Sequence, residues 1–141
     1  YLDLHLGNVF FAWGRNEYDR SALVGPTFKL GDLGVTKPES EVTPGCTLAN
    51  WMLPPESIDP NEFGPMDRRV DIYHAGLLLL QLLLGRPLEF SRQDILDGLP
   101  RQMALQLPEP YRTALEKALR RHVAFRTGSA RELYSDLQGA H

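Results

Sequence analysis

The sequence predicts a mainly α-helical domain that opens with a short β-hairpin. Two β-prone runs, 9–13 and 27–30, flank a stretch rich in turn-forming residues at 14–26, which indicates paired strands. The segment 31–65 is rich in proline and glycine, and apolar residues then return at helical spacing. A chain of 141 residues is long enough for one domain with its own core, so we assign a single domain to 1–141.

Composition excludes several classes of protein. The net charge is -3, which provides no general attraction to nucleic acid or anionic membranes. The most apolar run, 76–85, is about half the ~20 residues that a membrane-spanning helix needs, so we expect a buried helix and no membrane span. The only cysteine, Cys46, excludes an internal disulfide and fits a cytoplasmic location.

About four helices are expected around a central hydrophobic one. The central helix, at about 70–84, is apolar nearly all round and should be followed by Gly85 as its stop. The others are expected at 93–97 with Ser91 as N-cap, at 110–121, and at 129–138 with Ser129 as N-cap. Core-facing positions in the last two are Tyr111, Leu115 and Leu119, then Leu133, Tyr134 and Leu137.

Polar residues that could take part in a reaction stand at the ends of the predicted strands. Asp3 and Asn8 precede the first strand, and Asp32 follows the second in the turn 32–34. Two carboxylates and a carboxamide that converge suit phosphoryl transfer, in which one acid orients the attacking hydroxyl and the other groups hold Mg²⁺. Each motif alone is more often a turn or a loop cap, so the order and spacing of the motifs carry the prediction.

In that order and spacing the sequence resembles the eukaryotic-like protein kinase family. Residues 1–8 (YLDLHLGN) align with the catalytic loop H-R-D-L-x-x-x-N, 32–34 (DLG) with the magnesium motif D-F-G, and 54–56 (PPE) with A-P-E. Asp71, ahead of the leucine run, matches the start of the family's central helix. Arg126 resembles the arginine that pairs with the A-P-E glutamate. The resemblance covers nearly the whole chain and implies the C-terminal lobe of a kinase fold.

The resemblance implies a role for each chemical group of the catalytic loop. Asp3 would accept or orient the proton of the substrate hydroxyl, and His5 would stand beside it at the second catalytic position. Asn8 and Asp32 would ligate Mg²⁺ and, through it, the phosphates of ATP. Gly34 would complete the metal-binding turn as a structural residue.

Other residues would have structural roles. Glu56 and Arg126 would form a buried ion pair between the activation segment and the helical base. Asp71 would hold the catalytic loop by accepting backbone N–H bonds. Trp51 is expected to pack beneath the activation segment, and the long spacing around Thr47 leaves the family's substrate-docking threonine unassigned. His74 is expected to be a core histidine, because no second His or Cys has metal-ligand spacing.

Departures from the family pattern leave three functions open. Tyr1 and Leu2 replace His and Arg, and His5 replaces the usual lysine of Ser/Thr kinases. The leading expectation is ATP-dependent phosphoryl transfer to Ser/Thr hydroxyls of a protein substrate, with no nucleic-acid partner. The changes at Tyr1, Leu2 and His5 favour a pseudokinase or scaffold, and His5 also resembles aminoglycoside- and choline-type kinases, which phosphorylate small molecules.

The family's nucleotide clamp would lie upstream of this chain. The glycine-rich loop, the β3 lysine and the αC glutamate precede the catalytic loop, and here residues 1–8 already form that loop. We therefore expect a fragment that works with its own N-terminal lobe and has no kinase activity alone.

Overall fold

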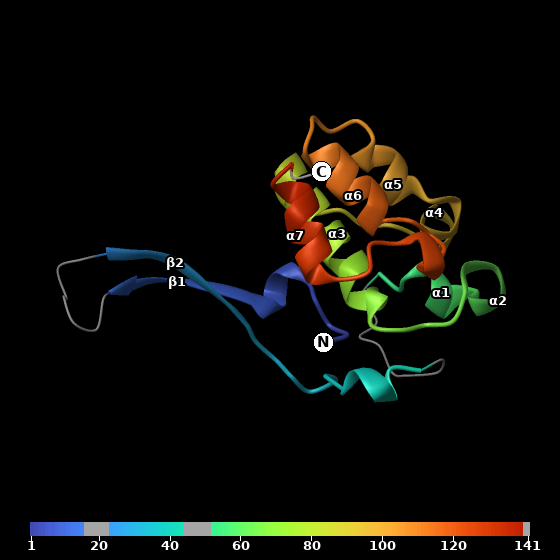
Figure 1. The fold of residues 1–141 in the computed structure, drawn as a ribbon, viewed down its shortest axis with the longest axis horizontal. Helices are drawn as coiled ribbons and strands as arrows, with labels where there is room; N and C mark the ends of the chain where they lie inside the picture. The colour runs from blue at the N-terminus through green and yellow to red at the C-terminus, as the bar shows by residue number, and fades with distance from the viewer. Residues whose placement is uncertain (16–22, 44–51, 140–141) are drawn as a thin grey trace.

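Helices form one body, and a two-stranded hairpin projects from it (Figure 1). The structure, a computed structural model, describes residues 1–15, 23–43 and 52–139. The strands are β1 (Val9–Arg15) and β2 (Leu23–Leu30), and the α-helices are α1 (Pro55–Ile58), α2 (Pro60–Phe63), α3 (Arg69–Leu84), α4 (Arg92–Asp97), α5 (Leu99–Ala104), α6 (Tyr111–Ala118) and α7 (Ala130–Leu137). Short 3-10 helices are η1 (Leu6–Asn8), η2 (Glu39–Glu41) and η3 (Val123–Phe125). The prediction of a mainly α chain with a small antiparallel sheet is confirmed.

Helix α3 lies at the centre of the helical body, as predicted. Tyr73, Leu77 and Leu80 are fully buried and contribute to a core shared with α4, α5, α6 and α7. A Cβ atom added to Gly76 would lie 2.9 Å from Leu119 Cδ2, so glycine allows α3 to approach the end of α6 closely. The helix ends at Gly85, whose φ of 65° is readily adopted by glycine.

The last turn of α3 is more exposed than its apolar sequence suggests. Leu82 is 57% exposed and Leu83 is 39% exposed, so the expectation of a helix buried all round is wrong at this end. Leu82 and Leu6 line a shallow hollow at the base of the hairpin. Gln81 is buried and Leu84 packs against the main core, so only one side of the last turn is open.

Short helices were missed in two places. Helices α1 and α2 lie in the segment 31–65 that we expected to be a loop, and α5 follows α4 with only Gly98 between them. Prolines explain the error, because Pro55, Pro60 and Pro100 lie in the first turn of these helices. Proline is favourable there since that N–H has no partner within the helix, but the prediction treated proline as a break.

The predicted starts of the later helices are close to the observed ones. Ser91 caps α4 and forms a capping box with Asp94, and the Ser129 side chain accepts the N–H of Glu132 at the start of α7. Helix α6 ends at Ala118, three residues earlier than the predicted end at 121.

The predicted inward faces of α6 and α7 are correct in part. Leu115 and Leu133 are buried, but Tyr111 is 38% exposed and Tyr134 is 65% exposed. In α7 the inward position is taken by Asp136, whose carboxylate lies 2.9 Å from Lys117 Nζ. The inward face of α7 therefore includes an ion pair to α6, which the apolar pattern did not predict.

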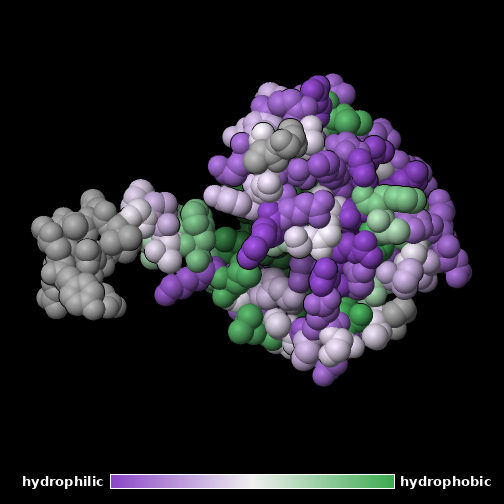
Figure 2. All heavy atoms as spheres, in the orientation of Figure 1, coloured by the Kyte–Doolittle hydropathy of each residue, from purple (hydrophilic) through white to green (hydrophobic). Residues whose placement is uncertain are grey.

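The hairpin extends beyond the predicted strands. Its register pairs Val9 with Leu30, Phe11 with Phe28, and Trp13 with Pro26, with an irregularity after Trp13. Because side chains alternate between the two faces of a strand, these pairs place an apolar ladder on a single face. The ladder is solvent-exposed, and apolar surface appears in Figure 2 where the hairpin leaves the mostly hydrophilic helical body.

Among the described residues, no helix combines the length and the apolar character that crossing a bilayer requires.

Candidate functional site

Asp3 and Asn8 lie together in the turn that leads into β1. The Asn8 Nδ2 group donates hydrogen bonds to the backbone oxygen of Asp3 at 3.0 Å and to its Oδ2 at 2.9 Å. Asn8 is buried and Asp3 is half-buried. The 3-10 turn η1 makes this contact, since Asn8 N also donates to the His5 carbonyl at 3.0 Å. The carboxylate of Asp3 is therefore held in a defined direction.

His5 lies on the other oxygen of the same carboxylate. Its Nε2 atom is 3.5 Å from Asp3 Oδ1, and its Nδ1 accepts the N–H of Gly7 at 3.1 Å. The bond from Gly7 fixes Nδ1 as the acceptor, so a neutral ring carries its proton on Nε2, which faces Asp3. The sequence analysis placed both residues at the catalytic position, and the structure brings them side by side.

Tyr1 connects this turn to the segment that follows β2. Its hydroxyl group donates to the carbonyl of Gly31, the residue before Asp32. Burial and the carboxylates of Asp3 and Asp32 raise the pKa of the Tyr1 phenol, whereas a hydrogen bond with Asn8 lowers it. The Tyr1 side chain therefore joins the turn that carries Asp3 to the residue before Asp32. Sequence reasoning treated Tyr1 only as a departure from a family pattern, and no sequence signal reveals this bridge.

Asp32 has unusual backbone geometry. Its φ is 53°, in the left-handed region that few residues other than glycine adopt, and its exposed side chain accepts the N–H of Gly34 at 3.1 Å. A Cβ at Gly34 would lie 3.2 Å from that carboxylate oxygen, so a larger residue there would require the Asp32 side chain to shift slightly. Leu2, next to Asp3, has a φ of 65°. Strained residues therefore occur at or beside both acids, as is common at functional sites.

The oxygen atoms present suit a magnesium ion. Asp32 offers an exposed carboxylate, and because Asn8 directs its Nδ2 toward Asp3, its Oδ1 points away from Asp3. Carboxylate and amide oxygens are the ligands that Mg²⁺ prefers, with water and phosphate oxygens completing the shell. Within the described residues, no cluster of three or more His, Cys, Asp or Glu side chains can hold a metal ion. Water and phosphate oxygens would therefore be required to complete the shell of Mg²⁺.

Asp71 of α3 holds the turn that carries Asp3. Its Oδ2 accepts from the backbone nitrogen of Tyr1 and its Oδ1 accepts from that of Leu2, both at 2.6 Å. This is the contact that the resemblance implied for Asp71. The two oxygens of the Asp71 carboxylate therefore hold the nitrogens of two successive residues, which orients this turn on α3.

Leu2 anchors the same turn from its apolar side. It is fully buried in a small cluster with Val42, Met66 and Val70, against which Val35 also packs. This cluster joins the turn before β1, the segment after β2 and the start of α3. Leu2 is therefore a packing residue, which its place in the motif did not indicate.

Glu56 and Arg126 form the predicted ion pair deep in the helical body. Arg126 Nη1 lies 2.6 Å from Glu56 Oε1 and Nη2 lies 2.7 Å from Oε2, and both side chains are fully buried. Arg126 also donates to three backbone carbonyls, those of Arg69, Arg120 and Arg121, so all five of its N–H groups are used. Its guanidinium lies 4.8 Å from the centre of the Tyr73 ring.

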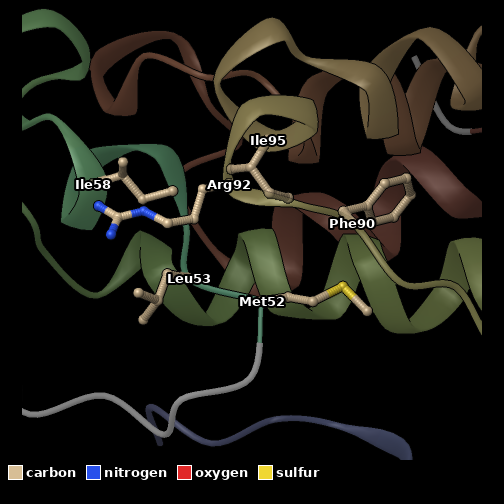
Figure 3. Close-up of a pocket in the computed structure, with 6 residues that line it drawn as sticks. All are labelled: Met52, Leu53, Ile58, Phe90, Arg92 and Ile95. Atoms are coloured by element: carbon tan, nitrogen blue, oxygen red, sulfur yellow. The ribbon is translucent and has the colours of Figure 1, made fainter.

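A small hollow lies between the segment before α1 and helix α4 (Figure 3). It encloses about 230 Å³ and is lined by Met52, Leu53, Ile58, Phe90, Arg92 and Ile95. The lining is apolar except for Arg92, which extends from α4 toward Ile58. We call this site the α1–α4 hollow.

His74 supports one edge of this hollow from α3. The ring is buried, as expected for a core histidine, and its Nε2 lies 3.3 Å from the carbonyl oxygen of Met52. Burial lowers the pKa of His74, although the carboxylate of Asp71 opposes this effect. The imidazole is therefore a neutral structural group. Cys46, Thr47 and Trp51 lie outside the described residues.

No protein family, curated protein or solved structure gives a significant match to this chain.

Proposed function

We propose that this chain is the C-terminal lobe of a protein kinase that transfers the γ-phosphoryl group of ATP to Ser/Thr hydroxyl groups of proteins. One observation carries the proposal: Asp3 and Asp32 flank the same end of the hairpin, where the Tyr1 hydroxyl bonds to the Gly31 carbonyl next to Asp32 and Asn8 is bonded to Asp3. A carboxylate for the hydroxyl, with a second carboxylate and an amide oxygen for the metal, is the set of groups that phosphoryl transfer uses.

The chain's own residues have distinct roles in this proposal. Asp3, held by Asn8, receives or orients the proton of the attacking hydroxyl. Asp32 and the Oδ1 of Asn8 hold Mg²⁺, which neutralises charge on the ATP phosphates when bound. His5 lies where it can donate a hydrogen bond to Asp3 and keep that carboxylate aligned.

A protein substrate is supported by the α1–α4 hollow. Its volume of about 230 Å³ and its apolar lining suit one apolar side chain of an extended polypeptide. Arg92, at its edge, forms no hydrogen bond or ion pair with the residues that the structure describes, so it can pair with an acidic residue of the substrate. The site therefore favours a polypeptide over a small sugar or choline.

A further lobe is supported by the hairpin. Phe11, Trp13 and Phe28 are 64%, 64% and 68% exposed on the apolar ladder, and an isolated two-stranded hairpin is only marginally stable in water. Exposed contiguous apolar surface of this kind marks an interaction site. We propose that the chain's own N-terminal lobe covers this ladder and supplies the nucleotide clamp.

The test is phosphate transfer by the complete gene product that contains this chain. With γ-labelled ATP and separate protein, aminoglycoside and choline acceptors, we expect label on Ser or Thr of protein. Asp3→Asn and Asp32→Asn should each reduce the rate by about 100-fold or more, because each removes a group that contacts reactants. Asp97→Asn, on exposed α4, is the matched control and should be fully active.

Other results would identify the alternative functions. Label only on a small molecule would replace the protein substrate with the aminoglycoside or choline type. No transfer together with normal ATP binding would indicate a pseudokinase. For the 141-residue chain alone we expect no transfer, but Mn²⁺ with ATP should broaden the NMR signals of residues 3–8 and 31–34, and Asp32→Asn should abolish that broadening.

A further inference from the structure

Three arginines surround a second hollow, on the helical body. Arg101 comes from α5, Arg120 and Arg121 directly follow α6, and Phe125 of η3 completes the lining of a cavity of about 330 Å³. None of these residues takes part in the proposed phosphoryl transfer. We propose that this site, the arginine pocket, binds the phosphate group of a phosphorylated side chain on a polypeptide.

The arginine pocket is held in place by contacts within the body. Glu116 Oε1 accepts from Arg101 Nε at 2.9 Å and from Arg120 Nε at 3.1 Å, and its Oε2 accepts from Arg120 Nη2 at 3.0 Å. Arg120 also donates to the carbonyl of Phe125 at 3.1 Å. The guanidinium of Arg121 donates to the carbonyl of Leu96. Ligand binding therefore needs little further ordering of these long side chains.

Charge in the pocket matches one phosphate group. Burial raises the pKa of Glu116, but hydrogen bonds from Arg120 and Arg101 lower it by more. The pKa therefore lies below its usual value, and the carboxylate is ionised. Three guanidinium groups and this carboxylate leave a local charge of +2. A phosphate monoester carries a charge of about -1.5 to -2 at neutral pH. One phosphate monoester group therefore balances the charge of the pocket.

Hydrogen-bond donors remain available for the ligand. Among the described residues, none accepts a hydrogen bond from Arg101 Nη1 or from Arg121 Nε and Nη2. A phosphate has three terminal oxygens that accept charge-assisted bonds of this kind from arginine. Arg101 lies in α5 and Arg121 follows α6, so donors from separate parts of the chain line the same cavity.

The size and the apolar wall favour a peptide over a polyanion. Nucleic acids and anionic membranes are bound by extended basic surfaces, whereas this pocket is a single cluster on a chain of net charge -3. Phe125 is 67% exposed beside the arginines, with the His122 ring 5.1 Å from its own. Its ring offers a contact for an apolar side chain next to the phosphorylated residue.

The test is an NMR titration of the ¹⁵N-labelled 141-residue chain. The probes are a short peptide with phosphoserine followed by leucine, its unphosphorylated form, inorganic phosphate and an oligo-dT strand. We expect the phosphopeptide to shift the Arg101 and Arg121 Nε–H signals and to bind more tightly than the other three. Arg101→Gln and Arg121→Gln should each weaken its binding about tenfold. Phe125→Ala should weaken phosphopeptide binding and leave phosphate binding unchanged.

Arg112→Gln is the matched control, because Arg112 lies on α6 outside the pocket and pairs with Glu109. The proposal is overturned if the phosphopeptide shifts no arginine signal, or if Arg112→Gln weakens binding as much as Arg101→Gln. Tighter binding of oligo-dT, or equal binding of phosphate and phosphopeptide, would also overturn it. Arg101→Gln keeps the test decisive should Arg121→Gln unfold the chain, since among the described residues Arg101 bonds only to the Glu116 side chain.

Discussion

The helical body and the hairpin use similar apolar residues in opposite ways. In the body, Tyr73 and Leu115 are fully buried, whereas Phe11 and Phe28 of the hairpin are 64% and 68% exposed. Burial of an apolar side chain stabilises a fold by about 1.5–3 kcal/mol, so most of the stability arises in the body. The hairpin instead positions Asp3 and Asp32 and presents an uncovered surface. Stability and the uncovered apolar surface are therefore placed in different regions.

Two contacts join these regions. Asp71 of α3 binds the amino nitrogen of Tyr1 and accepts the backbone N–H of Leu2, and the Leu2 side chain packs against Val70 in the same helix. The turn that carries Asp3 therefore rests on the rigid body even though the adjoining hairpin does not. This arrangement keeps the candidate catalytic residue Asp3 in place while the hairpin face stays uncovered.

The largest effect is expected from Arg126→Met, which tests how strongly the body depends on its buried ion pair. Loss of the guanidinium leaves the Glu56 carboxylate buried without its partner, so the free energy of unfolding should fall by about 3–5 kcal/mol. Urea denaturation followed by circular dichroism measures this loss. Arg112→Met removes an exposed pair with Glu109 and should change stability little. Equal losses in the two variants would show that the buried pair has no special role.

Leu115→Ala and Leu2→Ala compare the body with the turn that carries Asp3. Both leucines are fully buried. Leu115→Ala should lower the free energy of unfolding by about 2–5 kcal/mol, because it leaves a cavity in the main core. Leu2→Ala should mainly speed amide hydrogen exchange in residues 1–8 and 35–42, because its cluster lies at the edge of the body. Equal acceleration throughout α6 in the Leu2 variant would show that the two regions unfold as one unit.

Acid should weaken the body through His74. Burial lowers the pKa of His74 in the folded chain, so as the pH falls through about 6.5 the unfolded chain takes up this proton first. The contribution of the neutral His74 ring to the free energy of unfolding is fully present at higher pH. It declines on acidification by at most about 1.4 kcal/mol per pH unit. Urea denaturation at several pH values measures the slope. In His74→Gln the free energy of unfolding should fall less steeply with pH between 7.5 and 5.5. An unchanged slope would contradict the role given to His74.

The smallest effect on the body is expected from Phe11→Ser. The rings of Phe11 and Phe28 are 6.2 Å apart, so the change removes an aromatic contact worth about 0.5–1.5 kcal/mol within the hairpin. The urea midpoint of the helical signal should not move, and binding of a dye that reports exposed apolar surface should decrease. A lower midpoint would mean that the hairpin stabilises the body.

Helix ends were predictable where a residue type has one strong effect on the backbone. Ser91 and Ser129 predicted helix starts, and Gly85 predicted a helix end, because these residues satisfy or permit the backbone geometry of helix ends. Helices α1, α2 and α5 were missed because proline at a first helical position resembles proline in a loop. The local pattern does not distinguish these two uses.

The site was predictable as a set of residues and less so as an arrangement. Asp3, Asn8 and Asp32 were chosen from order and spacing, and Glu56 and Arg126 were expected to pair. The sequence did not indicate that Tyr1 bonds to Gly31 or that Leu2 belongs to an apolar cluster. Such contacts join segments distant in sequence, so no local pattern encodes them.

By itself, the sequence determined that the chain is mainly helical, that a hairpin comes first, and which polar groups are candidates for chemistry. Periodicity, caps and turn residues act over a few positions and can be recognised without the fold. Only the tertiary structure decided which apolar side chains are covered, and it brought Arg101 to Arg120 and Arg121 around one cavity. Burial and convergence depend on how elements pack, which is settled by contacts between distant segments.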